Sequence, residues 1–166
     1  MVQRSLNSCR TGNILVKTSM VDDSRPPVLE QLVILDWEIA KLGISAADIG
    51  QFAAQSLLLA RYATSHGPGR ALVGNFLESY EATLISEVNG GGMQDRKAFA
   101  TLFDANAIVG CTSAHAAVWG TLGQWNIDRE VKKETVRGAL KVCARSARGE
   151  FEGLGAKNMA EIWDGE

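Results

Sequence analysis

A four-residue apolar run that ends in a carboxylate is the feature of this sequence that most constrains its fold. Leu32, Val33, Ile34 and Leu35 follow one another without a polar residue, and Asp36 comes directly after them. An uninterrupted apolar run of this length is typical of a strand that is buried on both faces. A carboxylate at the end of such a strand is held rigidly at the edge of the sheet, where we expect it to serve in a functional site.

A second apolar run, at 14–16, lies earlier in the chain and directly follows Asn13. If this run and the run at 32–35 pair as an antiparallel hairpin, the start of the first strand lies beside the end of the second. Asn13 and Asp36 then emerge at the same end of the hairpin. An amide oxygen and a carboxylate are hard oxygen ligands, so the sequence predicts a magnesium site of the kind that phosphoryl transfer needs.

These segments resemble a known family. The run GNILV at 12–16, followed by V-I-L-D-W-E-x-A-x-x-G-x-x-x-x-D-I-G at 33–50, is similar to the aminoglycoside phosphotransferase and choline kinase-like family. The fungal members come closest, and the match is specific over 11–60 and weaker beyond. The resemblance implies the protein-kinase-like fold, with Mg²⁺ and ATP as cofactors and a small-molecule hydroxyl compound as the phosphoryl acceptor.

The resemblance also implies roles for individual residues. Asn13 matches the metal-binding Asn of the family's catalytic loop, H-G-D-x-x-x-x-N, and Asp36 matches the Asp that binds the metal in place of the kinase D-F-G aspartate. Asp48 matches the Asp that opens the following helix and braces the loop, although capping of that helix would also account for it. Glu38 is expected to be a supporting structural acid. A structural carboxylate at a strand end is the alternative interpretation of Asp36.

The sequence departs from the family pattern ahead of Asn13. Counting back from it places the family's His, Gly and catalytic Asp on Leu6, Asn7 and Ser8, so a serine stands where the general base is expected. A serine cannot accept a proton at neutral pH unaided, so no catalytic residue of the family is intact. Only ten residues precede Thr11, too few for the lobe that holds ATP. We therefore expect an irregular segment over 1–10 and a partial phosphotransferase domain, the C-terminal lobe, over 11–166.

Three hypotheses about function stay open at this point. The chain derives from a small-molecule kinase and keeps its metal site, although activity as an isolated chain is doubtful. Alternatively, it is a non-catalytic, pseudokinase-like binding module that associates through the cleft side that the missing lobe would cover. A truncated or misjoined gene model would also explain the abrupt onset of the resemblance at Thr11, and sequencing the transcript across that junction tests this.

Composition narrows the class of protein further. The chain is 46% hydrophobic and 22% charged, with a formal net charge of −2, which argues against nucleic-acid or membrane-surface binding. Its three cysteines are scattered and form no C-x-x-C pair, so we expect reduced thiols and no structural zinc. No apolar run is long enough to span a membrane. A cytoplasmic location is the expectation.

Helical periodicity dominates the rest of the chain. Apolar spacing and capping residues predict helices over 45–62, 70–88, 95–122 and 128–148, and a short helix in the tail. The predicted fold class is therefore α+β and mostly α, a small β-hairpin followed by a lobe of four to five helices.

The helix expected at 128–148 carries two patterns. We expect an inward stripe formed by Val136, Ala139, Leu140, Cys143 and Ala147. A basic ridge recurs every four residues on another face and is either solvated or faces an anionic partner. The ridge consists of Lys133, Arg137, Lys141 and Arg145.

Overall fold

The structure is a computed structural model that describes residues 4–5, 13–20, 24–35, 41–42, 45–62, 69–89, 104–121 and 127–151. Its strands are β1 (Arg4–Ser5), β2 (Ile14–Ser19), β3 (Val28–Ile34) and β4 (Lys41–Leu42). Its helices are α1 (Ser45–Tyr62), α2 (Gly69–Asn89), α4 (Ala105–Thr121) and α5 (Arg129–Ala147). A two-stranded antiparallel hairpin followed by four described helices confirms the predicted fold class.

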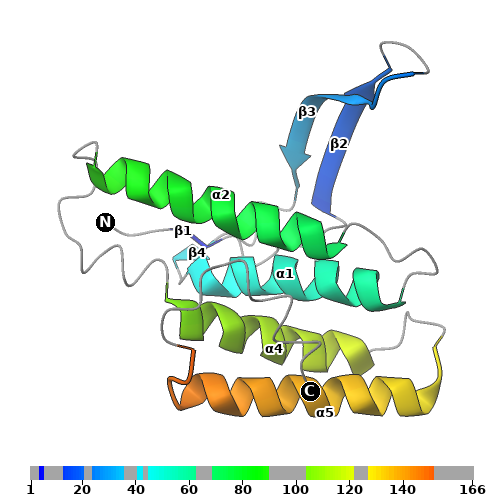
Figure 1. Cartoon of the computed structure of the whole chain (residues 1–166), viewed down its shortest axis with the longest axis vertical. Coiled ribbons are helices and arrows are strands. Elements are labelled where there is room, and N and C mark those ends of the chain that lie inside the picture. Colours follow the sequence, from blue (N-terminus) through cyan, green and yellow to red (C-terminus); the bar gives the residue numbers. More distant parts are fainter. Residues whose placement is uncertain are drawn as a thin grey trace.

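The four helices lie in layers in the order α2, α1, α4 and α5 (Figure 1). The most extensive helix contacts join α4 to α5 and α1 to α4, and α1 also contacts α2. The central helix α1 is buried over most of its length, and Ala53 and Ala54 are fully enclosed. None of the described helices is long and apolar enough to cross a membrane.

Two clusters of buried side chains form the core between these layers. The larger cluster joins all four helices and includes Phe151, which follows α5. The smaller cluster lies where α1, α4 and α5 meet and consists of Ala54, Leu58, Ala116 and Ala139. Its three alanines and single leucine indicate that the helices approach closely there, because small side chains leave little space between backbones.

Aspartate side chains set the starts of α4 and α5. Asp104 accepts a hydrogen bond at Oδ1 from the backbone N–H of Ala107, at 3.1 Å. Asp128 accepts a hydrogen bond from the backbone N–H of Glu130, at 2.7 Å, and is the N-cap of α5. The prediction of one helix over 95–122 is wrong at Asp104, which precedes α4, because an N-cap residue has a non-helical backbone. Residues 95–103 lie outside the described residues.

The inward stripe of α5 differs from the predicted one. Ala139 is buried as expected, and the other buried positions are Thr135, Val142 and Ser146. Leu140 is instead 56% exposed. At Ser146 this stripe lies close to α4, because a Cβ atom placed on Gly110 would be 2.6 Å from the hydroxyl oxygen of Ser146. The buried positions follow one another at intervals of three to four residues, and Leu140 lies about 100° around the helix from the buried Ala139, outside that line.

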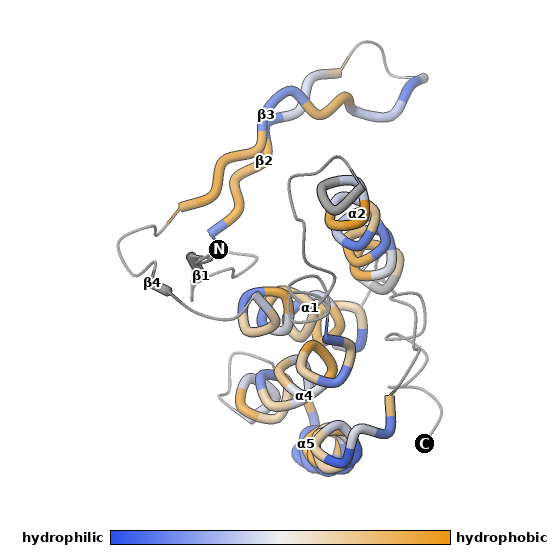
Figure 2. The backbone as a smooth tube through the Cα atoms, turned by 90° about the vertical axis from the view of Figure 1, so that its left-hand side faces the viewer, coloured by the Kyte–Doolittle hydropathy of each residue, from blue (hydrophilic) through white to orange (hydrophobic). Residues whose placement is uncertain are grey.

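The predicted hairpin is confirmed. β2 and β3 pair antiparallel with Ile14 opposite Ile34, and a bulge interrupts the register between Lys17 and Thr18. The prediction that the second strand is buried on both faces is wrong, because Leu32 is 52% exposed and Val33 is 36% exposed. These neighbours point to opposite faces of the hairpin. The hairpin extends away from the helices (Figures 1 and 2), and no described element covers either face.

A second, shorter ladder lies near the start of the chain. β1 pairs antiparallel with β4, with Arg4 opposite Leu42 and Ser5 opposite Lys41. At these two residues the chain departs from the irregular segment expected over 1–10, because Arg4 and Ser5 bond to another strand. The boundary at residue 11 and the domain over 11–166 stay predictions.

Candidate functional site

Asn13 lies at the open end of the hairpin. The backbone N–H of Leu35 donates a hydrogen bond to the backbone carbonyl of Asn13, at 2.8 Å. This bond continues the ladder one step beyond the pair Ile14 and Ile34, so the start of β2 lies beside the end of β3. Asp36, the next residue after Leu35, lies outside the described residues. The hairpin end is therefore confirmed, and the convergence of the two side chains of the metal site stays a prediction.

An ion pair lies near the other end of the hairpin. Nζ of Lys17 is 2.7 Å from a carboxylate oxygen of Glu30 across the strands. The hydrogen bond from Lys17, and then one from Ser19, lowers the pKa of Glu30 below its ordinary value. Both charged side chains are exposed, so this pair contributes little to stability. It favours the observed register, because Lys17 lies opposite Gln31, next to Glu30.

Asp48 lies in the first turn of α1, where the sequence predicted it. The residue is half-buried and its Oδ1 atom is enclosed by protein. A carboxylate in the first turn interacts favourably with the positive end of the helix dipole. The structure therefore agrees with the helix-opening position, and the proposed role of Asp48 in bracing the loop stays a prediction.

The remaining residues of the predicted site lie outside the described residues. These are Ser8, at the position of the general base, and Glu38, the expected supporting acid. Within the described ranges no group of three or more His, Cys, Asp or Glu side chains could hold a metal ion. That finding does not test the predicted magnesium site, because the site consists of the Asn13 amide and the carboxylate of Asp36, and Asp36 lies outside the described residues.

The described histidine and cysteines lie on α4 and α5. Nδ1 of the half-buried His115 is 2.8 Å from the backbone carbonyl oxygen of Cys111, one helical turn away. Cys111 and Cys143 are free and half-buried. Burial, and then the neighbouring Cys143, raises the pKa of Cys111 above its ordinary value. A raised pKa lowers the thiolate fraction, so Cys111 is a poor nucleophile at neutral pH.

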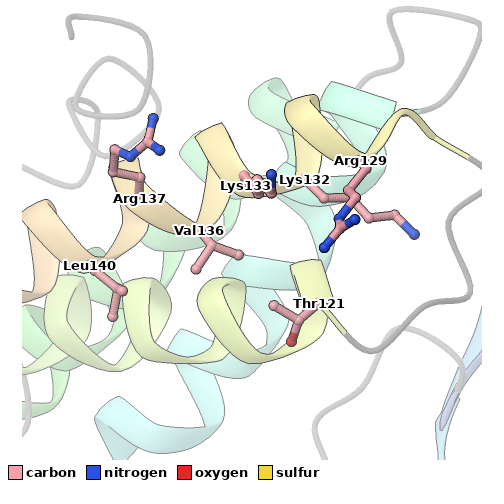
Figure 3. A pocket seen from close by; sticks show the side chains of 7 residues that line it. All are labelled: Thr121, Arg129, Lys132, Lys133, Val136, Arg137 and Leu140. Carbon is pink, nitrogen blue, oxygen red and sulfur yellow. The ribbon is translucent and has the colours of Figure 1, made fainter.

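A groove between α4 and α5 is a second candidate site, with a volume of about 430 Å³ (Figure 3). Of the predicted basic ridge, Lys133 and Arg137 line the groove, and Lys141 and Arg145 do not. Sequence reasoning missed Arg129 and Lys132. Helical spacing could have found them, because positions 129, 132, 133, 136 and 137 share one face of the helix. The groove is lined by Thr121, Arg129, Lys132, Lys133, Val136, Arg137 and Leu140.

Comparison with known proteins relates the chain to a kinase. No family model matches it. It is 25% identical over 120 residues to a 4-hydroxytryptamine kinase of Psilocybe cubensis, and the match covers 72% of this chain. The chain spans 28% of the length of that relative. It is therefore distantly similar to part of a small-molecule kinase, and the narrower family that the sequence predicted stays a prediction.

Proposed function

We propose that this chain is the C-terminal lobe of a small-molecule phosphotransferase of the aminoglycoside phosphotransferase and choline kinase-like family. Two independent findings support the proposal. A hairpin followed by a helical lobe is the architecture that the resemblance implies for this part of the fold. The distant similarity to a 4-hydroxytryptamine kinase points to the same class of enzyme.

The proposed function of the hairpin end is to hold Mg²⁺ through the side chains of Asn13 and Asp36. The observation that carries this is the hydrogen bond between Leu35 and Asn13, because it brings Asn13 beside the residue that immediately precedes Asp36. The donor set fits the metal, since Mg²⁺ prefers carboxylate and carbonyl oxygen ligands and retains water in its other positions. When bound, Mg²⁺ would offset the negative charge of the ATP phosphates.

Phosphoryl transfer by this chain is proposed to be slow. The family's loop aspartate accepts the proton of the acceptor hydroxyl, and Ser8 stands at that position. Losing a general base costs about 10²- to 10⁴-fold in rate. Nucleotide binding is therefore the activity to measure, because it depends on the metal ligands and not on the missing base.

Isothermal calorimetry of the purified chain with MgATP tests the metal site. We expect saturable binding that Asp36→Asn weakens by about tenfold or more, because the variant removes a charged metal ligand. Asp23→Asn is the matched control, since it removes the same charge at a position in the sequence between β2 and β3 that the resemblance assigns to no site. Circular dichroism checks that both variants fold. An absence of magnesium-dependent heat, or equal effects of the two variants, would contradict the proposal.

A binding module without catalysis is the second candidate, and the exposed apolar faces of the hairpin favour it. Leu15, Val16, Leu29 and Leu32 are all more than half exposed. A two-stranded hairpin is marginally stable alone, and exposed strand edges pair readily with other strands. The proposed occupant of these faces is a second copy of the chain.

Sedimentation velocity over a range of concentrations tests self-association. We expect a dimer that Leu32→Lys dissociates, while Lys17→Gln on the same hairpin leaves it intact, because only the first variant places a charge on the apolar face. A monomer at all concentrations would contradict the binding-module hypothesis. Nucleotide binding by a monomer would favour the phosphotransferase lobe.

A further inference from the structure

The groove between α4 and α5 has an apolar floor. Val136 and Leu140 lie on one side of α5, and Thr121 lies at the end of α4 (Figure 3). Leu140 is the most exposed large apolar side chain of the described helices, at 56%. A volume of about 430 Å³ falls within the range of sites that bind small organic molecules.

The rim of this groove is positively charged. Arg129, Lys132 and Arg137 form no salt bridge with any other described residue. The fourth cation, Lys133, is paired with Glu130 at 2.7 Å, but both side chains are exposed. An exposed ion pair of this kind contributes little to stability, so Lys133 can readily exchange Glu130 for another anion. Four of the residues that line the groove are basic and none is acidic, although the guanidinium of Arg137 is directed away from it.

The charge is local and does not follow from the composition of the chain. Helix α5 carries six basic and two acidic residues, whereas the whole chain has a formal net charge of −2. A low-polarity floor strengthens the attraction between the rim and an anion that lies on it. Charge and apolar surface thus occur together at this one groove.

The dimensions of the groove favour an elongated ligand. Arg129 and Leu140 are eleven residues apart on α5, which corresponds to about 16 Å along the helix axis. Figure 3 shows the side chains of Val136 and Leu140 directed toward α4, and the guanidinium of Arg129 at the same end of the groove as Thr121. The guanidinium of Arg137 is turned away from the groove in that view.

We propose that this groove binds a free medium-chain carboxylate. The alkyl chain lies over Val136 and Leu140, and the carboxylate interacts with Arg129 and Lys132. This arrangement buries apolar surface of both partners and gives two cations a counterion, which the described protein does not supply. The hairpin lies on the opposite side of the helical stack from α5 (Figure 1), so this site is independent of the proposed metal site.

Nuclear magnetic resonance of the full chain with decanoate, below its micellar concentration, tests the proposal. We expect saturable shifts of the backbone amides of Thr121, Val136 and Leu140, and much weaker binding of the uncharged analogue decanol. The variant Arg129→Gln/Lys132→Gln is expected to weaken decanoate binding by about tenfold or more. Lys141→Gln is the matched control, because Lys141 lies on α5 but does not line the groove, and it should change binding less than twofold.

Three results would overturn the proposal. The first is equal affinity for decanoate and decanol, and the second is a set of shifts confined to the exposed hairpin. The third is binding to a membrane surface in place of the free ligand. In that case the chain would sediment with phosphatidylserine vesicles, the double variant would not, and free decanoate would show no saturable binding. Leu140→Glu adds a readout that folding does not confound, because this exposed position should tolerate the change while the new carboxylate repels the ligand.

Discussion

The backbone N–H of Phe151 donates a hydrogen bond to the side-chain oxygen of Asn106, 45 residues earlier, at 3.1 Å. The hydroxyl of Ser146 donates to the backbone carbonyl of the same Asn106. The start of α4 is therefore joined to the end of α5 through one residue. This connection holds Phe151, which is 2% exposed, in the larger core cluster, and the guanidinium of Arg145 lies 4.9 Å from its ring centroid.

Asn106 should accordingly contribute to stability through its side chain. We expect Asn106→Ala to lower the free energy of unfolding by about 1–3 kcal/mol, because the partly buried N–H of Phe151 loses its acceptor. Asn106→Asp keeps an oxygen in place and should cost less. Urea denaturation followed by circular dichroism measures both. Equal losses in the two variants would show that the hydrogen bond is not the cause.

Glycines in the helices should respond to alanine according to the space around them. A Cβ atom on Gly50 would lie 2.6 Å from Cβ of Cys111 and 2.7 Å from the backbone nitrogen of Thr112. Backbone cannot move aside cheaply, so Gly50→Ala should destabilise the chain by about 1–3 kcal/mol. Gly138→Ala meets nothing within 4 Å and should be neutral or stabilising by up to about 1 kcal/mol. Thermal unfolding of the two variants, side by side, checks the difference in sign.

Leucines of the helical lobe and of the hairpin should differ in their contribution to stability. Leu77 on α2 is fully buried, so Leu77→Ala should lower the free energy of unfolding by about 2–5 kcal/mol. Leu32 is half exposed, and Leu32→Thr should change the free energy of unfolding by no more than about 0.5 kcal/mol. Chemical denaturation of the dilute protein provides the measurement. A large loss for Leu32→Thr would show that a further element or a second copy covers the hairpin.

Glu150 should make stability depend on pH in the acidic range. Its hydrogen bond with Arg148, and then that with Arg145, lowers the pKa of Glu150 below its ordinary value. A carboxyl whose pKa is lower in the folded than in the unfolded state stabilises the fold above its unfolded pKa. That contribution disappears as the pH falls through the folded pKa.

Titration of the Glu150 side-chain carbon by nuclear magnetic resonance should therefore give a midpoint below that of an ordinary glutamate. Glu150→Gln should flatten the pH dependence of unfolding in the acidic range. Glu134→Gln serves as the control. It removes the same charge from a residue on α5 that forms no salt bridge with Arg145 or Arg148. A normal Glu150 midpoint would contradict the expected effect of the arginines.

Elements that depend on local sequence were predicted well. The helix at 45–62 and the start of α5 follow from capping residues and apolar spacing, because both act within a few residues of the chain. The hairpin follows from two apolar runs that pair with each other. The position of Asn13 at the end of that hairpin is confirmed for the same reason, and its partnership with Asp36 stays a prediction.

Burial and the second candidate site were predicted less well. Leu140 fits the inward stripe by spacing, yet α5 packs through positions 135, 139, 142 and 146, which leaves Leu140 on the surface. The sequence predicted Lys133 and Arg137 as part of a basic ridge but did not predict the groove, because residue spacing along one helix does not show where a concave surface forms. Thr121 completes that surface from the preceding helix, across a connection that includes residues 122–126.

The sequence by itself determined where α1 and α2 begin and end, to within a residue, and that β2 pairs antiparallel with β3. Tertiary structure alone decided that Leu140 and the apolar side chains of the hairpin are exposed, and where basic residues gather around a groove. The physical reason is the range of the interactions. Capping, periodicity and hairpin pairing act between residues close in the chain, whereas burial and grooves depend on which distant elements approach one another and how closely.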